Sequence, residues 1–404
     1  MRKVRNGYLI AAIIGCFWAF TIAVIIAVLM SFSTGESFRP SFLVSFLQGI
    51  ATGLTTLFYR NKPILSVGLA VISIIFCSLG FGSILIDETV SFSTQAFASV
   101  LFAIFTAWPL IIILNSLSPG DVDKHDFEDA VIKFLTGFGY IFFTTIVVIP
   151  FYVMLMTSLK NQQELLQNPL DFSIDLSKGM NLFRSYFELF GQFGFGSYLW
   201  TSFYVSVITV VITLAFSIPG AYAVARLRFK GRTAFGRSVL VIYMVPMIVL
   251  ALPIYIAFSM TGLRNTVTGI VMIYPVTTIP VALYMLQGYF RGLPYEVEEA
   301  GLMDGLSRRA VIWKITLPLA LPAIASVSLY VFMIAWNEFL LAFMLLDDPS
   351  KFTLTRGVSS LNSSEVPRQH LMAGAVIATL PIMVIFLSLE RFMTNGLTAG
   401  SVKG

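Results

Sequence analysis

The chain alternates long apolar runs with short polar loops. A helix that crosses a bilayer needs about 20 consecutive, mostly apolar residues, and runs of this kind recur along the whole sequence. We count ten of them, at residues 8–30, 40–59, 63–85, 96–115, 134–155, 197–221, 238–258, 266–287, 320–343 and 372–389. The pattern predicts an all-α fold, a polytopic bundle of about ten transmembrane helices.

The composition agrees with a membrane protein. Hydrophobic residues make up 57% of the chain and charged residues only 12%, about half of the charged share in a typical soluble domain. The net charge is +5, but the basic residues gather in short loops beside the apolar runs. We therefore expect them to set orientation, and we expect membrane lipid but no nucleic acid as a partner of the chain.

The distribution of Lys and Arg predicts which side each loop occupies. Basic residues precede the first run and fill the loops after the second, sixth and eighth runs. With ten spans these regions share one side, which the positive-inside rule identifies as the cytoplasm. Both termini are then cytoplasmic, and the chain is a multi-pass protein of the cell membrane. The loop at 121–133 falls on this side as well, although it is mostly acidic.

A charged stretch divides the chain into two groups of apolar runs. We predict an accessory four-span block at 1–117, a charged linker at 118–133 and a six-span core at 134–404. The paired broken segments that indicate an inverted-repeat transporter are not evident in the sequence. A secondary transporter driven by an ion gradient remains an alternative. It would need acidic residues near the middle of the membrane, and Glu338 comes closest.

The most informative polar segment follows the eighth run. It reads Glu299-Ala300-Gly301-Leu302-Met303-Asp304-Gly305 and ends on Ile315-Thr316-Leu317-Pro318. Pro294 suits the first turn of a helix, and the acidic residues after it complement a helix N-terminus. Gly305 can end that helix in the left-handed conformation, and Ser307 can cap a second helix. We predict two short helices joined at a glycine hinge on the membrane surface.

This spacing, Glu-Ala-x₄-Gly-x₉-Ile-x-Leu-Pro, resembles the EAA loop of the membrane subunits of ABC importers. In that family the loop is a cytoplasmic elbow that docks into the ATPase subunit, which implies the same role for residues 291–318. The implied coupling residues are Glu299, Ala300, Gly301, Leu302, Asp304, Gly305, Arg308, Ile315, Leu317 and Pro318. The chain departs from the motif at Gly301, where the family has a second Ala. A small residue there still allows close helix contact.

A second resemblance lies at the C-terminus. Residues 395–404 are similar to the ending of permeases of the carbohydrate-uptake branch, especially the smaller permease of maltose and trehalose importers. In those relatives the tail reaches the interface between the two ATPase subunits, which implies a contact by Thr398, Ala399, Gly400 and Lys403. A frayed terminus is the alternative. The resemblance covers about residues 138–404.

A third feature is the triplet Trp336-Asn337-Glu338 near the outer end of the ninth run. Similar triplets occur at this point in carbohydrate permeases. An ionisable side chain at membrane depth usually faces a cavity or a partner, so Asn337 and Glu338 are candidates for the translocation path. The alternative is a group that reaches water at the interface. The loop at 347–368 is long for a helix hairpin, and we expect it to contact a substrate-binding protein.

The sequence contains no phosphate-binding loop, no nucleophile elbow and no zinc-binding His-Glu-x₂-His motif. We therefore expect a transport subunit that is not an enzyme and binds no metal or cofactor itself. The resemblance implies a type I ABC importer permease that moves maltose, trehalose or a related oligosaccharide by alternating access. It also implies a second permease, two ATPase subunits that bind ATP and Mg, and an extracytoplasmic sugar-binding protein. An ABC permease for a different solute remains an alternative.

Overall fold

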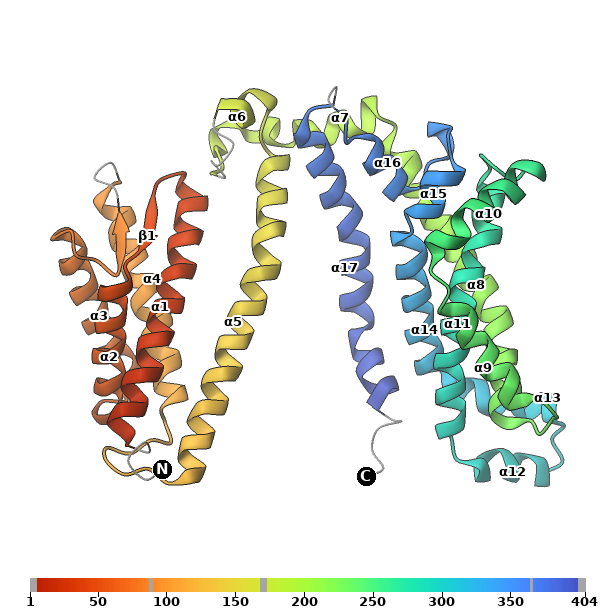
Figure 1. The fold of residues 1–404 in the computed structure, drawn as a ribbon, viewed down its shortest axis with the longest axis horizontal. Coiled ribbons are helices and arrows are strands. Elements are labelled where there is room, and N and C mark those ends of the chain that lie inside the picture. The colour runs from red at the N-terminus through yellow and green to blue at the C-terminus, as the bar shows by residue number, and fades with distance from the viewer. Residues whose placement is uncertain (1–5, 87–89, 168–172, 364–365, 399–404) are drawn as a thin grey trace. The chain divides into compact units, whose positions relative to one another are not determined.

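The computed structural model describes residues 6–86, 90–167, 173–363 and 366–398. These residues form helices joined by short loops, together with one two-stranded antiparallel sheet. The chain divides into two compact units, residues 1–182 and 183–404 (Figure 1).

The first unit is built mainly from five long helices. Its elements are α1 (Gly7–Thr34), β1 (Phe38–Pro40), α2 (Phe42–Phe58), α3 (Lys62–Ser78), β2 (Ile84–Ile86), α4 (Phe92–Ile113), α5 (Lys124–Ser158) and α6 (Gln162–Gln167), followed by the 3₁₀ segment η2 (Leu176–Phe183). The two strands pair with Arg39 opposite Leu85. Helix α5 packs against α1 and α4, which assigns it to this unit.

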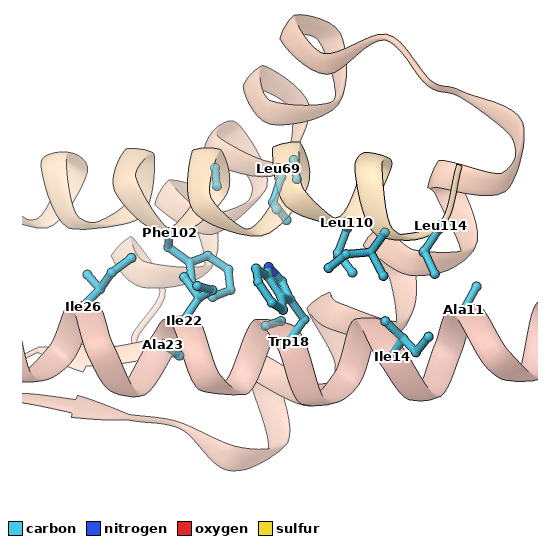
Figure 2. Packing of buried hydrophobic residues seen from close by; sticks show 14 of the residues in the cluster. Ala11, Ile14, Trp18, Ile22, Ala23, Ile26, Leu69, Phe102, Leu110 and Leu114 are labelled. Carbon is cyan, nitrogen blue, oxygen red and sulfur yellow. The ribbon is translucent and has the colours of Figure 1, made fainter. Parts of the chain in front are cut away.

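Close helix contact shapes the core of the first unit. A Cβ atom at Gly15 would lie 2.2 Å from the carbonyl oxygen of Gly49, and one at Gly53 would lie 2.2 Å from that of Ala11. Small residues of this kind are typical where membrane helices touch. Figure 2 shows Trp18 of α1 beside residues of α4, where its indole N–H donates to the carbonyl oxygen of Phe105 at 3.0 Å. The largest side chain of this core therefore has its polar atom satisfied.

The second unit contains the elements that surround the predicted elbow. They are α7 (Arg184–Gln192), α8 (Phe195–Arg226), α9 (Arg232–Tyr243), α10 (Met247–Met260), α11 (Val267–Gly292), α12 (Tyr295–Met303), α13 (Arg308–Val311), the π-helical turn η3 (Ile312–Thr316), α14 (Leu317–Asn337), α15 (Leu340–Leu345), the 3₁₀ turn η4 (Pro349–Lys351), α16 (Leu354–Ser360) and α17 (Arg368–Thr398). Helices α8, α11 and α14 pack together at the centre.

A row of buried hydroxyl side chains runs along α8. Its members are Ser202, Ser206, Thr209, Thr213 and Ser217. The hydroxyl groups of Thr213 and Thr278 of α11 lie 2.6 Å apart. Small polar residues at three- and four-residue spacing allow two membrane helices to approach closely and to form hydrogen bonds. The row therefore favours a firm α8–α11 pair in the middle of the second unit.

The predicted helical membrane architecture is confirmed, with corrections to its details. Seven of the described helices are long and apolar enough to cross a membrane. The remaining predicted runs correspond to shorter apolar helices, α2, α3 and α10, so the count of ten spans is not confirmed. The predicted run 238–258 is interrupted before α10, where Pro246 stands in an extended conformation. The predicted run 320–343 is interrupted at Glu338, where α14 ends.

The units of the fold do not coincide with the predicted segments. Packing places α5 in the first unit, whereas the sequence pattern predicts that residues 134–158 belong to the six-span core. Packing within one chain does not report which segments belong together in a family. The division at 118–133 therefore stays a prediction.

Candidate functional site

The elbow consists of two short helices separated by a glycine. Helix α12 ends at Met303, and Gly305 follows it with φ +82°, the left-handed conformation that glycine adopts without steric cost. The hydroxyl of Ser307 then accepts a hydrogen bond from the N–H of Ala310 and caps α13. The predicted pair of helices is therefore present. One detail differs, because Pro294 stands directly before α12 instead of within its first turn.

Gly301 lies where α12 packs against the chain that leads into α14. A Cβ atom at this position would lie 2.5 Å from Cδ1 of Ile315 and 3.3 Å from Cγ2 of Val311. The first atom is the tip of a flexible side chain, so a methyl group requires only a local shift, whereas a larger side chain does not fit. This packing explains why a small residue occupies the position at which the sequence departs from the motif.

The centre of the elbow is a buried carboxylate that the sequence pattern alone does not single out. Glu298 accepts hydrogen bonds from the hydroxyl of Tyr222 on α8 and from the hydroxyl of Thr316, both at 3.1 Å. Its Oε1 also lies 3.4 Å from Nε of Arg226, the last residue of α8. The side chains of Glu298 and Arg226 are only 10% and 1% exposed. We call these four residues the elbow anchor.

Arg226 joins the anchor to the beginning of α12. Its Nη2 donates a hydrogen bond to the carbonyl oxygen of Leu293 at 2.7 Å, and its guanidinium lies 4.0 Å from the centre of the Tyr295 ring. Removing one member of a buried ion pair costs about 3–5 kcal/mol, because the remaining charge is left uncompensated. The elbow is therefore fixed to the end of α8 by charge, hydrogen bonding and aromatic contact together.

The sequence assigned both charges to simpler roles. It treated Arg226 as one of several basic residues that set orientation, and Glu298 as a favourable charge in the first turn of a helix. A signal for the anchor was present, because Glu298 and Gly301 are three residues apart and share one face of α12. Both are buried in the structure, whereas Glu299 and Ala300 between them are exposed.

The predicted coupling residues fall into two groups in the structure. The exposed ones are Glu299, Ala300, Asp304, Gly305, Arg308 and Pro318. The others pack within the elbow, with Gly301 buried and Leu302, Ile315 and Leu317 partly buried. Met303 lies on the outer face of α12 and is 87% exposed. The elbow thus has an inner face that packs against the rest of the second unit and an outer face that is exposed.

Glu338 has a different environment from the one predicted. It directly follows α14, and its carboxylate accepts hydrogen bonds from the N–H groups of Leu341 at 2.8 Å and Ala342 at 3.1 Å. It therefore caps α15. Asn337 is exposed, and its amide donates to the carbonyl oxygen of Met333 at 2.9 Å. The translocation-path role of both residues stays a prediction.

The remaining predicted contacts lie at the C-terminus. Thr398 is the last residue of α17. Ala399, Gly400 and Lys403 lie outside the described residues, and their role in contacting the ATPase stays a prediction. In the described part of the chain, no three His, Cys, Asp or Glu side chains come together as a metal site.

A polar contact at the other end of the second unit joins α7 to α17. Glu188 lies 2.7 Å from Nε of Arg184 and 2.7 Å from Nε2 of His370. The hydrogen bond from Arg184, followed by the one with His370, lowers the pKa of Glu188 from its ordinary value. The contact favours a charged Glu188 that holds α7 against the beginning of α17.

Comparisons with known proteins agree with the elbow. The family described as "Binding-protein-dependent transport system inner membrane component" matches residues 217–396, a range that contains the whole elbow. The inner membrane ABC transporter permease protein YcjP of Escherichia coli is 37% identical over 269 residues, which cover 66% of this chain and 95% of that protein. The trehalose/maltose transport system permease protein MalG of Thermococcus litoralis is 31% identical over 280 residues, 69% of this chain and 99% of that protein.

A solved structure supports the fold. A chain of a bacterial ABC transporter involved in the import of the acidic polysaccharide alginate superimposes with a TM-score of 0.56 at 22% identity. The match covers 65% of this chain and 97% of the other. From the elbow geometry and these similarities together, the chain belongs to the family of binding-protein-dependent transport system inner membrane components. It is a multi-pass permease subunit of an ABC importer, a transport subunit and not an enzyme, and ATP is hydrolysed on a separate subunit.

Proposed function

We propose that this permease imports a carbohydrate, and specifically maltose, trehalose or a related oligosaccharide. Several similar permeases are named for sugars of this class. Besides the trehalose/maltose permease, they include the trehalose permease SugB of Mycobacterium tuberculosis, 35% identical over 225 residues, 55% of this chain and 82% of that protein. The arabinooligosaccharide permease AraQ of Halalkalibacterium halodurans is 31% identical over 280 residues. The sugars in these three names are short oligosaccharides of neutral sugars.

We further propose the complete assembly. This chain pairs with a second permease, with two ATPase subunits that bind ATP and Mg, and with one extracytoplasmic sugar-binding protein. Helix α5 supports the pairing with another membrane subunit, because none of the residues in its most apolar stretch is buried in the described chain. The elbow and both chain termini are cytoplasmic, in keeping with the clustering of Lys and Arg near the elbow.

The elbow anchor is the observation that supports the proposed mechanism most strongly. When the ATPase subunits close on ATP, a movement at the outer face of α12 can reach the spans only if the elbow does not yield. The ion pair between Arg226 and Glu298 joins α12 directly to a 32-residue helix of the membrane bundle. In this mechanism Glu299, Ala300 and Arg308 contact the ATPase, and the spans rock between inward-open and outward-open states.

The C-terminal tail and the triplet have supporting roles in this proposal. Thr398, Ala399, Gly400 and Lys403 reach the ATPase interface and limit how the two ATPase subunits separate. Asn337 is the better candidate for a sugar contact, since its side chain is exposed at the end of α14. The carboxylate of Glu338 already accepts two backbone hydrogen bonds.

One experiment tests this function. An affinity tag on this chain allows the whole complex to be purified from native membranes and its ATPase and binding protein to be identified. The complex is then placed in proteoliposomes and supplied with labelled maltose, trehalose, arabinotriose or a control amino acid. We expect ATP-dependent uptake of at least one of the sugars and none of the amino acid. Uptake of the amino acid alone, or sugar uptake without ATP, would overturn the proposal.

A further inference from the structure

The end of the second unit opposite the elbow carries a folded segment between α15 and α17. Residues 346–361, which we call the distal segment, contain η4 and α16. Figure 1 shows α15 and α16 at one end of the second unit and α12 and α13 at the other. The corner of the distal segment is exposed at Asp347, Pro349 and Ser350. A segment of this kind needs fixed support if it is to present the same surface in every molecule.

Asn265, in the turn before α11, supplies much of that support. Its Oδ1 accepts hydrogen bonds from the N–H groups of Asp347 at 3.1 Å and Asp348 at 3.0 Å. Its own N–H donates to the carbonyl oxygen of Leu345 at 2.7 Å. The neighbouring Arg264 forms an ion pair with Asp347 at 2.5 Å. Both the backbone and the side chain of Asn265 are therefore committed to the beginning of the distal segment.

The backbone of Asn265 shows that this arrangement is specific. Its φ of +57° makes it the one non-glycine residue with positive φ in the described parts of the chain. Among residues with a side chain, Asn tolerates this conformation best, because its short amide can form local hydrogen bonds. Strained positions of this kind persist where the surrounding structure requires them, and they concentrate at functional sites.

Two further contacts hold the distal segment to α8. The hydroxyl of Ser202 accepts a hydrogen bond from the N–H of Leu354 at 2.6 Å. Gly357 rests on the ring of Tyr198, so closely that a Cβ atom there would lie 2.2 Å from Cδ2 of the ring. These contacts fix α16, whereas Asn265 fixes the exposed corner that precedes it. The corner therefore depends on Asn265 for its orientation.

We propose that Asn265 is a positioning residue for docking of the extracytoplasmic sugar-binding protein, because it orients the corner at residues 347–350 that the binding protein contacts. This inference rests on the proposed function, which places the distal segment outside the cell. Asn265 itself does not touch sugar or nucleotide. Its effect is exerted through the two backbone N–H groups that it holds.

Three variants separate the contributions of Asn265. N265D keeps the acceptor oxygen and tolerates positive φ, so it should preserve the corner. N265G accepts positive φ without strain but removes the acceptor oxygen. N265A removes the acceptor oxygen and also tolerates positive φ poorly. Hydrogen exchange in the purified complex reports directly on the amides of Asp347 and Asp348. We expect exchange about tenfold faster in N265G and N265A and near the wild-type rate in N265D.

The functional measurement uses the binding protein identified by purification of the complex, loaded with its sugar. We expect the concentration that gives half-maximal ATPase stimulation to rise about tenfold in N265G, with basal ATPase and maximal stimulation unchanged. N265D should give the wild-type half-maximal concentration. The measurement uses N265G, so it does not depend on whether N265A folds. An unchanged half-maximal concentration in N265G, with wild-type stimulation intact, would overturn this inference alone. Absence of stimulation in the wild-type complex would instead overturn the proposed function.

Discussion

Arg226 at the end of α8 and Glu298 in the first turn of α12 form a buried ion pair, with Nε and Oε1 3.4 Å apart. The pair joins the membrane bundle to the elbow at the point where the chain leaves the bundle. The elbow must be rigid and firmly attached to the bundle if it is to transmit movement. In this permease the attachment consists of the two charges and the hydroxyl groups of Tyr222 and Thr316.

The first prediction concerns this ion pair. R226M or E298L alone leaves one buried charge without its partner and should lower the free energy of unfolding by about 3–5 kcal/mol. The double variant R226M/E298L replaces the pair with apolar side chains and should recover most of that loss. Thermal unfolding of the purified complex in detergent measures the effect. R228M is the matched control, since Arg228 is exposed and nearby. Equal destabilisation by R228M and R226M would contradict a special role for the pair.

The second prediction concerns Gly301. G301A adds one methyl group against the tip of Ile315, which can move, so coupling of ATP hydrolysis to uptake should stay near the wild-type value. G301V adds branches that meet both Ile315 and Val311, and overpacking of this kind costs about 1–3 kcal/mol. We expect fewer sugars transported per ATP in G301V and partial recovery in G301V/I315A, which removes the nearest obstructing atom, Cδ1 of Ile315. If G301V transports normally, the packing between α12 and η3 is not needed for coupling.

The third prediction concerns the hinge at Gly305. A Cβ atom at this position meets no atom within 4 Å, so any effect of a substitution comes from the backbone. With φ at +82°, G305V should cost about 1–2 kcal/mol and weaken coupling, whereas G305N should be milder because Asn tolerates the left-handed conformation. Uptake and ATPase rates are compared at equal amounts of assembled complex. Equal rates in G305V and G305N would argue against backbone strain as the cause.

The fourth prediction is a pH dependence at α7. Hydrogen bonds from Arg184 and then His370 lower the pKa of Glu188 below its ordinary value of 4.5. A carboxylate with a lowered pKa contributes stability above its ordinary pKa and loses that contribution as the pH falls through the lowered value. Pepsin cleavage within α7 should therefore increase below pH 4.5. E188Q should already show the increased cleavage just below pH 4.5, and its cleavage should change little as the pH falls further. A wild-type cleavage profile in E188Q would contradict the role of Glu188.

The sequence predicted local features of the elbow well and its long-range contacts poorly. The two helices, the left-handed Gly305 and the Ser307 cap all depend on residues within one or two turns, and the structure contains each of them. The anchor brings Tyr222 to Glu298, which is 76 residues away, and no local pattern specifies that approach.

Other features of the second unit also depend on contacts that the local sequence does not specify. Asn265 and Asp347 are 82 residues apart, so their hydrogen bond could not be inferred from the turn that contains Asn265. The sequence pattern singles out Glu338 as an ionisable residue near the end of a predicted span. Its role as a helix cap depends on the bend after α14, which the continuous apolar run concealed. The apolar pattern likewise predicted where helices lie, and the break before α10 falls at Pro246.

The most direct test of the account is a cross-link from the outer face of α12. In a background with Cys16 and Cys77 replaced by Ala, M303C presents a thiol at a position that is 87% exposed on the elbow. S350C is the matched control, because Ser350 lies in η4 between α15 and α16, which are at the opposite end of the second unit from α12. In the assembled complex a maleimide–benzophenone reagent, attached to the thiol and then activated by light, should join M303C to the ATPase subunit and leave S350C unlinked to it. An impermeant maleimide applied to intact cells should label only S350C. Labelling of M303C from outside, or its failure to cross-link to the ATPase in the assembled complex, would contradict the elbow as the coupling element.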